Sequence, residues 1–136
     1  MSPKPSDYAA DKKGKTGLKR IVNAFGYSRD GLCAAYRHES AFRQLLWLNA
    51  ALIILSLILG FGPATRSLLI MASFISLITE LFNTAIEAAV DHTSTEKHEL
   101  AKRAKDAGSA AQLLALMLLG IIWLIALWRE FGVNFW

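Results

Sequence analysis

The chain carries three long apolar runs, and these limit what it can fold into. The first run, Leu45–Phe61, and the third, Ala107–Leu127, contain no charged residue, and the second extends from about Thr65 to Val90. A helix of about 20 such residues crosses the roughly 30 Å hydrocarbon core of a bilayer. Backbone groups inside the hydrocarbon must pair within their own segment, which favours helices. The runs therefore predict an all-α membrane protein with three transmembrane helices, at about residues 45–61, 65–90 and 107–128.

The segment before the first run is polar and basic. Nine of the fifteen Lys and Arg residues lie between Lys4 and Arg43. Residues 1–15 are charged and contain prolines, which predicts a disordered tail ahead of a membrane domain over residues 16–136. Apolar residues recur at spacings of three and four over about 16–26 and again over 32–44, with glycines between. This pattern predicts two N-terminal amphipathic interfacial helices over about residues 16–44, or alternatively surface helices of a soluble bundle.

Basic residues also indicate how the chain is oriented in the membrane. The turn between the first two runs holds one basic residue, Arg66, whereas the segment Asp91–Asp106 holds four. The positive-inside rule therefore predicts that the N-terminus and the second loop are cytoplasmic and the C-terminus lies on the opposite side. A pI near 9.4 is also found in nucleic-acid-binding proteins. Here the basic residues flank apolar runs, so we expect lipid headgroups and no nucleic acid as partners.

Several common motifs are missing from the sequence. The single cysteine, Cys33, allows no intrachain disulfide, and the first apolar run begins too late for a cleavable signal peptide. No phosphate-binding loop of the G-x-x-x-x-G-K-[ST] type occurs. The three histidines have no zinc-like spacing with one another or with Cys33, so we expect no structural zinc. A nucleotide, if bound, would need an unusual site.

The second apolar run carries a polar stripe. Glu80, Asn83, Glu87 and Asp91 follow one another at i, i+3, i+7 and i+11, which places them on one side of a helix. A carboxylate near the bilayer centre costs about 2.5–3.5 kcal/mol on insertion scales, and such residues usually mark function. The alternative is that they link helices or act as counter-ions for Lys and Arg.

Two carboxylates one or two turns apart can divide the work of phosphoryl transfer. The one nearer the cytoplasm, Glu87, can hold Mg²⁺, which prefers oxygen ligands. The deeper one, Glu80, lies in a drier place and suits a general base, while Asn83 can hydrogen-bond either. Lys105 and Arg103 in the second loop can neutralise phosphate oxygens. A lysine in such a loop is also an ordinary topology signal.

The stretch Glu80–Asp91 resembles the signature of the small bacterial integral-membrane diacylglycerol kinases. The resemblance covers about residues 16–132 and leaves out only the ends. Its further blocks are Arg20, Ala24–Ser28, Gly31-Leu32, Glu39, Ala41–Gln44, Glu96, His98–Leu100 and Ala104–Ala111.

The resemblance implies an enzyme that uses ATP and Mg²⁺ to phosphorylate diacylglycerol, giving phosphatidic acid. It implies a homotrimer in the bacterial inner membrane, with active sites shared between subunits at the cytoplasmic interface. Glu80 would be the catalytic base, supported by Asn83, and Glu39 and Glu87 would bind the metal. Contacts with the nucleotide would come from Arg20, Tyr27, Glu96, His98, Lys105 and Asp106, and contacts with the lipid from Arg20, Glu80 and Ser109.

Other functions remain open at this point. A sister branch of the same family phosphorylates undecaprenol instead of diacylglycerol. The buried carboxylates could also serve a small membrane transporter or proton relay, and a non-catalytic scaffold would use them only for packing. An ATP-dependent phosphorylation assay on both lipids separates these classes.

Overall fold

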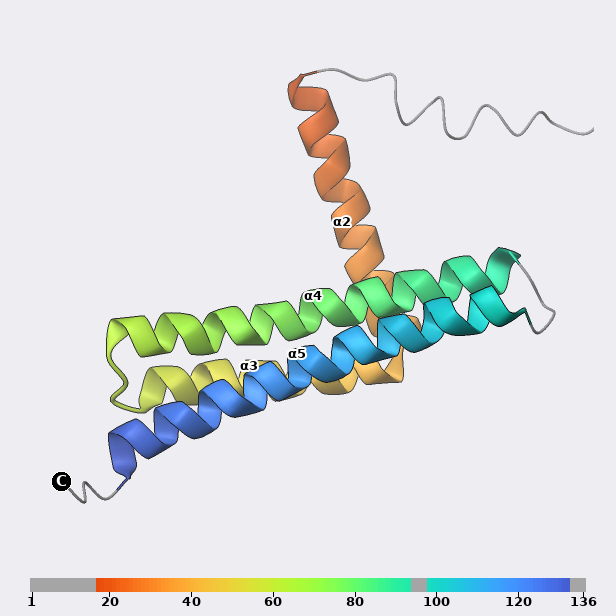
Figure 1. The fold of residues 1–136 in the computed structure, drawn as a ribbon. Coiled ribbons are helices and arrows are strands. Elements are labelled where there is room, and N and C mark those ends of the chain that lie inside the picture. Colours follow the sequence, from red (N-terminus) through yellow and green to blue (C-terminus); the bar gives the residue numbers. More distant parts are fainter. Residues whose placement is uncertain (1–16, 94–97, 133–136) are drawn as a thin grey trace, which may run out of the picture. The chain divides into compact units, whose positions relative to one another are not determined.

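The computed structural model describes residues 17–93 and 98–132 of the chain. These residues form four helices and no strand: α2 (Leu18–His38), α3 (Ser40–Ile58), α4 (Pro63–Thr93) and α5 (Glu99–Phe131) (Figure 1). The chain divides into two units, Met1–Ala34 and Ala35–Trp136, and each is described by itself. The predicted tail, residues 1–15, lies outside the described residues.

The N-terminal unit contains most of α2. We predicted two helices separated at Gly26 and Gly31, and this prediction was wrong, because α2 is continuous from Leu18 to His38. A glycine inside a helix costs only about 1 kcal/mol relative to alanine, which does not suffice to end it. Its apolar side chains, including Leu18 and Phe25, are largely exposed, as an interfacial helix requires.

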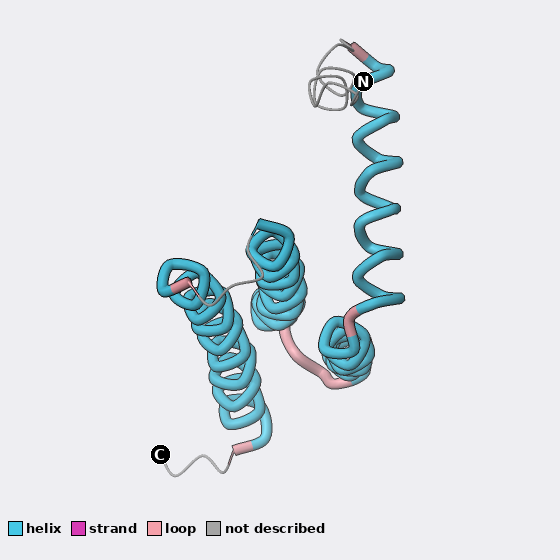
Figure 2. Tube along the Cα trace, turned by 90° about the vertical axis from the view of Figure 1, so that its right-hand side faces the viewer, coloured by secondary structure: helices cyan, strands magenta, loops and turns pink. Residues whose placement is uncertain are grey.

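The second unit holds the three membrane spans. Helices α3, α4 and α5 are all long and apolar enough to cross a bilayer, which confirms the predicted all-α architecture with three transmembrane helices. Helix α4 packs against both α3 and α5, and Figure 2 shows the short connection that leads from α3 into α4. The polar stripe of the second run therefore lies on the helix that contacts both others.

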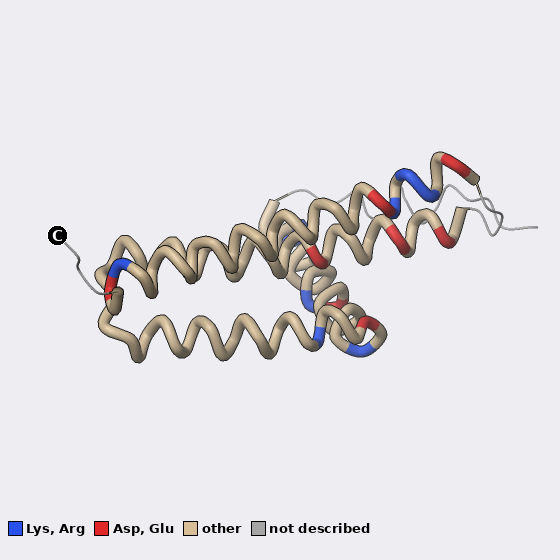
Figure 3. Tube along the Cα trace, turned by 60° about the horizontal axis from the view of Figure 1, so that its bottom comes forward, with Lys and Arg blue, Asp and Glu red and all other residues tan. Residues whose placement is uncertain are grey.

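Helices α4 and α5 are longer than the hydrocarbon core is thick. Their 31 and 33 residues correspond to roughly 46 and 50 Å, against about 30 Å for the core. The predicted spans 65–90 and 107–128 fall inside these longer helices. Many charges of the second unit gather at the end where α4 finishes and α5 begins, here called the charged end, and others lie around the start of α3 and at the far end of α5, while the middle of the three helices carries almost none (Figure 3). Because charged residues are costly inside the hydrocarbon, we expect the extra length of α4 and α5 to lie at the charged end.

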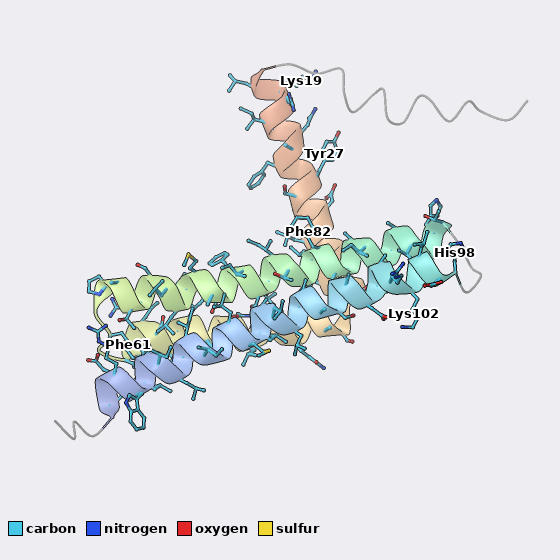
Figure 4. All side chains as sticks on the ribbon, in the orientation of Figure 1. Lys19, Tyr27, Phe61, Phe82, His98 and Lys102 are labelled. Atoms are coloured by element: carbon cyan, nitrogen blue, oxygen red, sulfur yellow. The ribbon has the colours of Figure 1, made fainter. Side chains whose placement is uncertain are left out.

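The apolar core lies at the opposite end. It consists of Phe61, Leu69, Ala72, Leu119, Trp123 and Ala126, all buried. The ring of Phe61 meets that of Trp123 edge to face, with centroids 6.0 Å apart. Arg66 donates hydrogen bonds to the carbonyl oxygens of Ser56 and Phe61 and so fixes the turn between α3 and α4. Figure 4 labels Phe61 at this end and His98 and Lys102 at the charged end.

Candidate functional site

Glu80 is a buried carboxylate in the middle of the molecule. It lies on α4, one turn beyond the buried Ser76, and only 6% of its surface is exposed. Because α4 is unbroken from Pro63 to Thr93, Asn83, Glu87 and Asp91 continue the same stripe toward the charged end. The exposure rises along the stripe, from buried Glu80 to exposed Asp91. The deeper of the two glutamates is thus the drier one.

Two further carboxylates act on Glu80. Both Glu87 and Glu39 lie close enough to interact with it electrostatically. Glu39 is the residue at which α2 ends and α3 begins, with an extended backbone and no hydrogen bond from its side chain to the start of α3. Its carboxylate is therefore not used as a helix cap. Glu80 thus has two other carboxylates within electrostatic reach, and a bound cation would offset this repulsion.

The donor set can be compared with what a metal ion needs. Among residues 17–93 and 98–132, no three His, Cys, Asp or Glu side chains converge to enclose an ion. Mg²⁺ is commonly held by one or two carboxylates, with water and substrate phosphates completing its octahedron. Glu39 and Glu87, which both lie near Glu80, offer oxygen donors of the kind that Mg²⁺ prefers.

Asn83 lies between the two glutamates of α4 and contacts α5. Its amide Nδ2 donates to Glu87 Oε1 at 3.2 Å. Its carbonyl Oδ1 is buried and has no hydrogen-bond partner. A Cβ atom built on Gly108 of α5 would lie only 2.5 Å from this oxygen, so the two helices approach each other closely at this point.

The predicted nucleotide-contacting residues Lys105 and Asp106 of α5 are each paired in the structure. Lys105 Nζ lies 2.5 Å from Asp91 Oδ1 of α4. Asp106 accepts from Lys102, one turn earlier on the same helix. All four side chains are at least one third exposed, so solvent and ligands reach them. Lys105 lies between the carboxylate stripe and the outer end of α5.

His98 caps α5 and borders a cavity. The N–H of Leu100 donates to His98 Nδ1 at 3.2 Å, so in the neutral ring Nε2 carries the proton and can donate outward. A cavity of about 410 Å³ opens beside it. The cavity is lined by Ala89, Val90, Thr93, His98, Leu100, Ala101 and Ala104. Its size and apolar walls suit a flat organic group.

The remaining predicted site residues are Ser109, Arg20, Tyr27 and Glu96. Ser109 is exposed on α5 beside Gly108. Arg20 and Tyr27 lie on α2 in the N-terminal unit, and their contact with the site stays a prediction. Glu96 lies outside the described residues.

A polar contact between α3 and α4 was missed in the sequence. Asn49 Nδ2 donates to Leu45 O and to Ser76 Oγ, both at 2.9 Å, and Ser76 donates to Ser73 O. Asn49 is fully buried. A lone Asn in a charge-free run was the available signal, since such residues commonly hydrogen-bond across helices in membranes. The contact fixes α3 against α4 one turn from Glu80.

Fold and site together define a small three-span membrane enzyme with acidic and basic residues gathered at one end. The model of the family described as prokaryotic diacylglycerol kinase matches residues 26–127. The chain belongs to this family, and it is a lipid kinase of a bacterial membrane.

Relatives support the same assignment over most of the chain. The diacylglycerol kinase of Pseudomonas aeruginosa is 50% identical over 123 residues, covering 90% of this chain and 95% of the relative. That of Helicobacter pylori is 47% identical over 118 residues, covering 87% and 91%. That of Escherichia coli K12 is 45% identical over 117 residues, covering 86% and 96%.

Proposed function

We propose that this lipid kinase transfers the γ-phosphoryl group of ATP to the free hydroxyl of diacylglycerol, giving phosphatidic acid and ADP at the cytoplasmic interface. The observation that carries the proposal is the buried carboxylate of Glu80 within electrostatic reach of Glu39 and Glu87. The three relatives above carry the name diacylglycerol kinase. This supports the choice of lipid.

Glu80 is the general base of the proposed reaction. Its carboxylate accepts the proton of the lipid hydroxyl while the hydroxyl oxygen forms a bond to the γ-phosphorus. The bond between that phosphorus and the β–γ bridging oxygen breaks, and ADP leaves with the electron pair. Glu80 lies on α4 between the charged end and the apolar core, where we expect the glycerol part of a lipid to reach.

Glu39 and Glu87 hold the magnesium ion in this proposal. When bound, Mg²⁺ supplies positive charge that neutralises the phosphate oxygens as the phosphoryl group moves. Asn83 orients Glu87 through its 3.2 Å hydrogen bond. Such a bond to a ligating carboxylate commonly tunes metal affinity.

The nucleotide binds along the outer part of α5. Lys105 contacts the phosphates, exchanging its present partner Asp91 for phosphate oxygens. The apolar cavity beside His98 accepts the adenine, and His98 Nε2 donates to it. Arg20, Tyr27, Glu96 and Asp106 complete the nucleotide contacts.

The lipid and the neighbouring subunits complete the site. Arg20 and Ser109 contact the lipid. Three copies share their active sites, and residues 16–136 act as one catalytic domain. The charged ends of α4 and α5 face the cytoplasm with the N-terminus, and the C-terminus lies across the inner membrane. This orientation is supported by the larger number of basic residues near the start of α5, Lys102, Arg103 and Lys105, than at the opposite end, Arg66 and Arg129.

The test is a phosphorylation assay with purified protein in detergent micelles, using γ-labelled ATP and either diacylglycerol or undecaprenol at equal mole fraction. The proposal predicts labelled phosphatidic acid and at least tenfold lower turnover on the polyprenol. A preference for undecaprenol makes the chain a polyprenol kinase. Ion flux in liposomes with no ATP use indicates a transporter or proton relay.

A further inference from the structure

One glycine of α5 is in an unusual place. The described helices contain four glycines: Gly26, Gly31, Gly108 and Gly120. A Cβ atom added to Gly26, Gly31 or Gly120 would meet nothing within 4 Å. At Gly108 the added atom would lie 2.5 Å from Asn83 Oδ1 and 3.6 Å from Ile86 Cδ1. Gly108 is also buried. The absence of a side chain at this one position therefore permits the close approach of α5 to Asn83.

The carboxamide of Asn83 is held from two sides. On one side its Nδ2 donates to Glu87 Oε1. The opposite assignment of N and O would set two acceptors against each other, so the hydrogen bond decides the orientation. On the other side Oδ1, buried and without a hydrogen-bond partner, lies against Gly108. A rotation of the carboxamide away from Gly108 carries Nδ2 away from Glu87.

We propose that Gly108 is a positioning residue of the kinase, which acts through Asn83 on the metal-binding carboxylate of Glu87. This inference rests on the proposed function, in which Glu87 holds Mg²⁺. A methyl group at position 108 displaces the end of the Asn83 side chain. Only a flexible side chain has to move, so the fold persists while the Asn83–Glu87 hydrogen bond is lost. Removing such support from a metal ligand typically lowers metal affinity by about 10- to 100-fold.

The matched pair is Gly108→Ala and Gly120→Ala, because both change glycine to alanine inside α5. Alanine has a higher helix propensity than glycine at either position. The midpoint temperature of thermal unfolding should therefore not fall for either variant. The main readout is the affinity for Mn²⁺ in the presence of a non-hydrolysable ATP analogue. It is measured by electron paramagnetic resonance on the full-length protein in micelles. We expect the Mn²⁺ dissociation constant to rise about tenfold or more for Gly108→Ala and to stay within twofold for Gly120→Ala.

The same glycine change, made in an Asn83→Ala variant, shows whether Gly108 acts through Asn83. Asn83→Ala removes the displaced group, so adding Gly108→Ala to it should change the Mn²⁺ dissociation constant by less than about twofold. An equal loss in both backgrounds overturns the inference, because the glycine then acts by another route. Wild-type affinity in Gly108→Ala overturns it as well.

A direct readout separates this inference from the proposed function. The side-chain amide signals of Asn83, assigned with ¹⁵N-labelled protein and the Asn83→Ala variant, should shift in Gly108→Ala and stay in place in Gly120→Ala. Unchanged signals in Gly108→Ala overturn the positioning role alone. Failure of the wild-type protein to bind Mn²⁺ with nucleotide contradicts the proposed function, whatever the amide signals show.

Discussion

Lys105 Nζ of α5 lies 2.5 Å from Asp91 Oδ1 of α4. The pair joins the two helices that extend from the membrane, one turn beyond Glu87 on α4. An ion pair this exposed contributes at most about 1 kcal/mol to stability, so Lys105 can exchange Asp91 for another anion at little cost. Lys105 therefore provides a positive charge at the end of the carboxylate stripe, and a phosphate group can replace Asp91 as its partner.

Lys105→Met should raise the KM for ATP. A charge-assisted hydrogen bond to phosphate is worth about 1.5–3 kcal/mol, so we expect a rise of at least about tenfold. Arg129→Met is the control on the same helix, since Arg129 lies in the last turn of α5 and is assigned no nucleotide contact. Steady-state kinetics at saturating lipid measure both. Equal KM values for the two variants would show that Lys105 does not contact ATP.

Glu39→Gln should weaken the response to magnesium. The neutral amide keeps the shape of the side chain but removes one of three neighbouring negative charges. We expect the half-saturating Mg²⁺ concentration to rise on the order of tenfold. Glu99→Gln, in the first turn of α5, serves as the control and should leave that concentration unchanged. An unaltered magnesium titration in Glu39→Gln would remove Glu39 from the metal site.

Trp123→Ala should destabilise the protein strongly. Trp123 is 7% exposed and packs edge to face on Phe61, so its removal leaves a cavity in the apolar core at the end opposite the site. We expect a loss of about 3 kcal/mol in the free energy of unfolding. Trp128→Ala, with a side chain 76% exposed, should stay within about 0.5 kcal/mol. Unfolding by SDS titration gives both values, and equal losses would contradict the packing of α5 described above.

Asn49→Ala should lower the free energy of unfolding by less than Trp123→Ala does. The variant loses the hydrogen bond from Asn49 to Ser76 that joins α3 and α4, and such bonds in membranes average below about 1 kcal/mol. We expect a loss of about 1 kcal/mol in SDS titration, with KM values for ATP and lipid unchanged. Ser67→Ala, at an exposed position of α4, should show no change. A large shift in either KM would instead give Asn49 a part in substrate binding.

The three spans could be predicted from the sequence because long runs without charge have few other structures open to them. The polar stripe was equally accessible, since helical spacing alone aligns Glu80, Asn83 and Glu87. The helix break was predicted wrongly. Gly26 and Gly31 look like helix ends but fall inside α2, whereas the chain breaks at Glu39, which has no breaker signal of its own.

Contacts between helices could not be predicted from the sequence. Neither the pairing of Asp91 with Lys105 nor the fit of Gly108 against Asn83 follows from spacing along one helix, because both depend on how α4 and α5 are rotated toward each other. Glu39 was identified only through family resemblance. Its proximity to Glu80 depends on how α3 packs against α4, which no periodicity along one helix indicates.

The role of Glu80 is tested most directly by Glu80→Gln, with Glu130→Gln at the exposed far end of α5 as its matched control. The measurement is the initial rate of phosphatidic acid formation from diacylglycerol at saturating ATP and Mg²⁺, with nucleotide binding recorded on the same samples. General-base catalysis typically contributes 10²- to 10⁴-fold, so we predict that Glu80→Gln lowers kcat at least about 100-fold while nucleotide binding persists and Glu130→Gln keeps full activity. Wild-type turnover in Glu80→Gln would contradict the assignment of this buried carboxylate as the base.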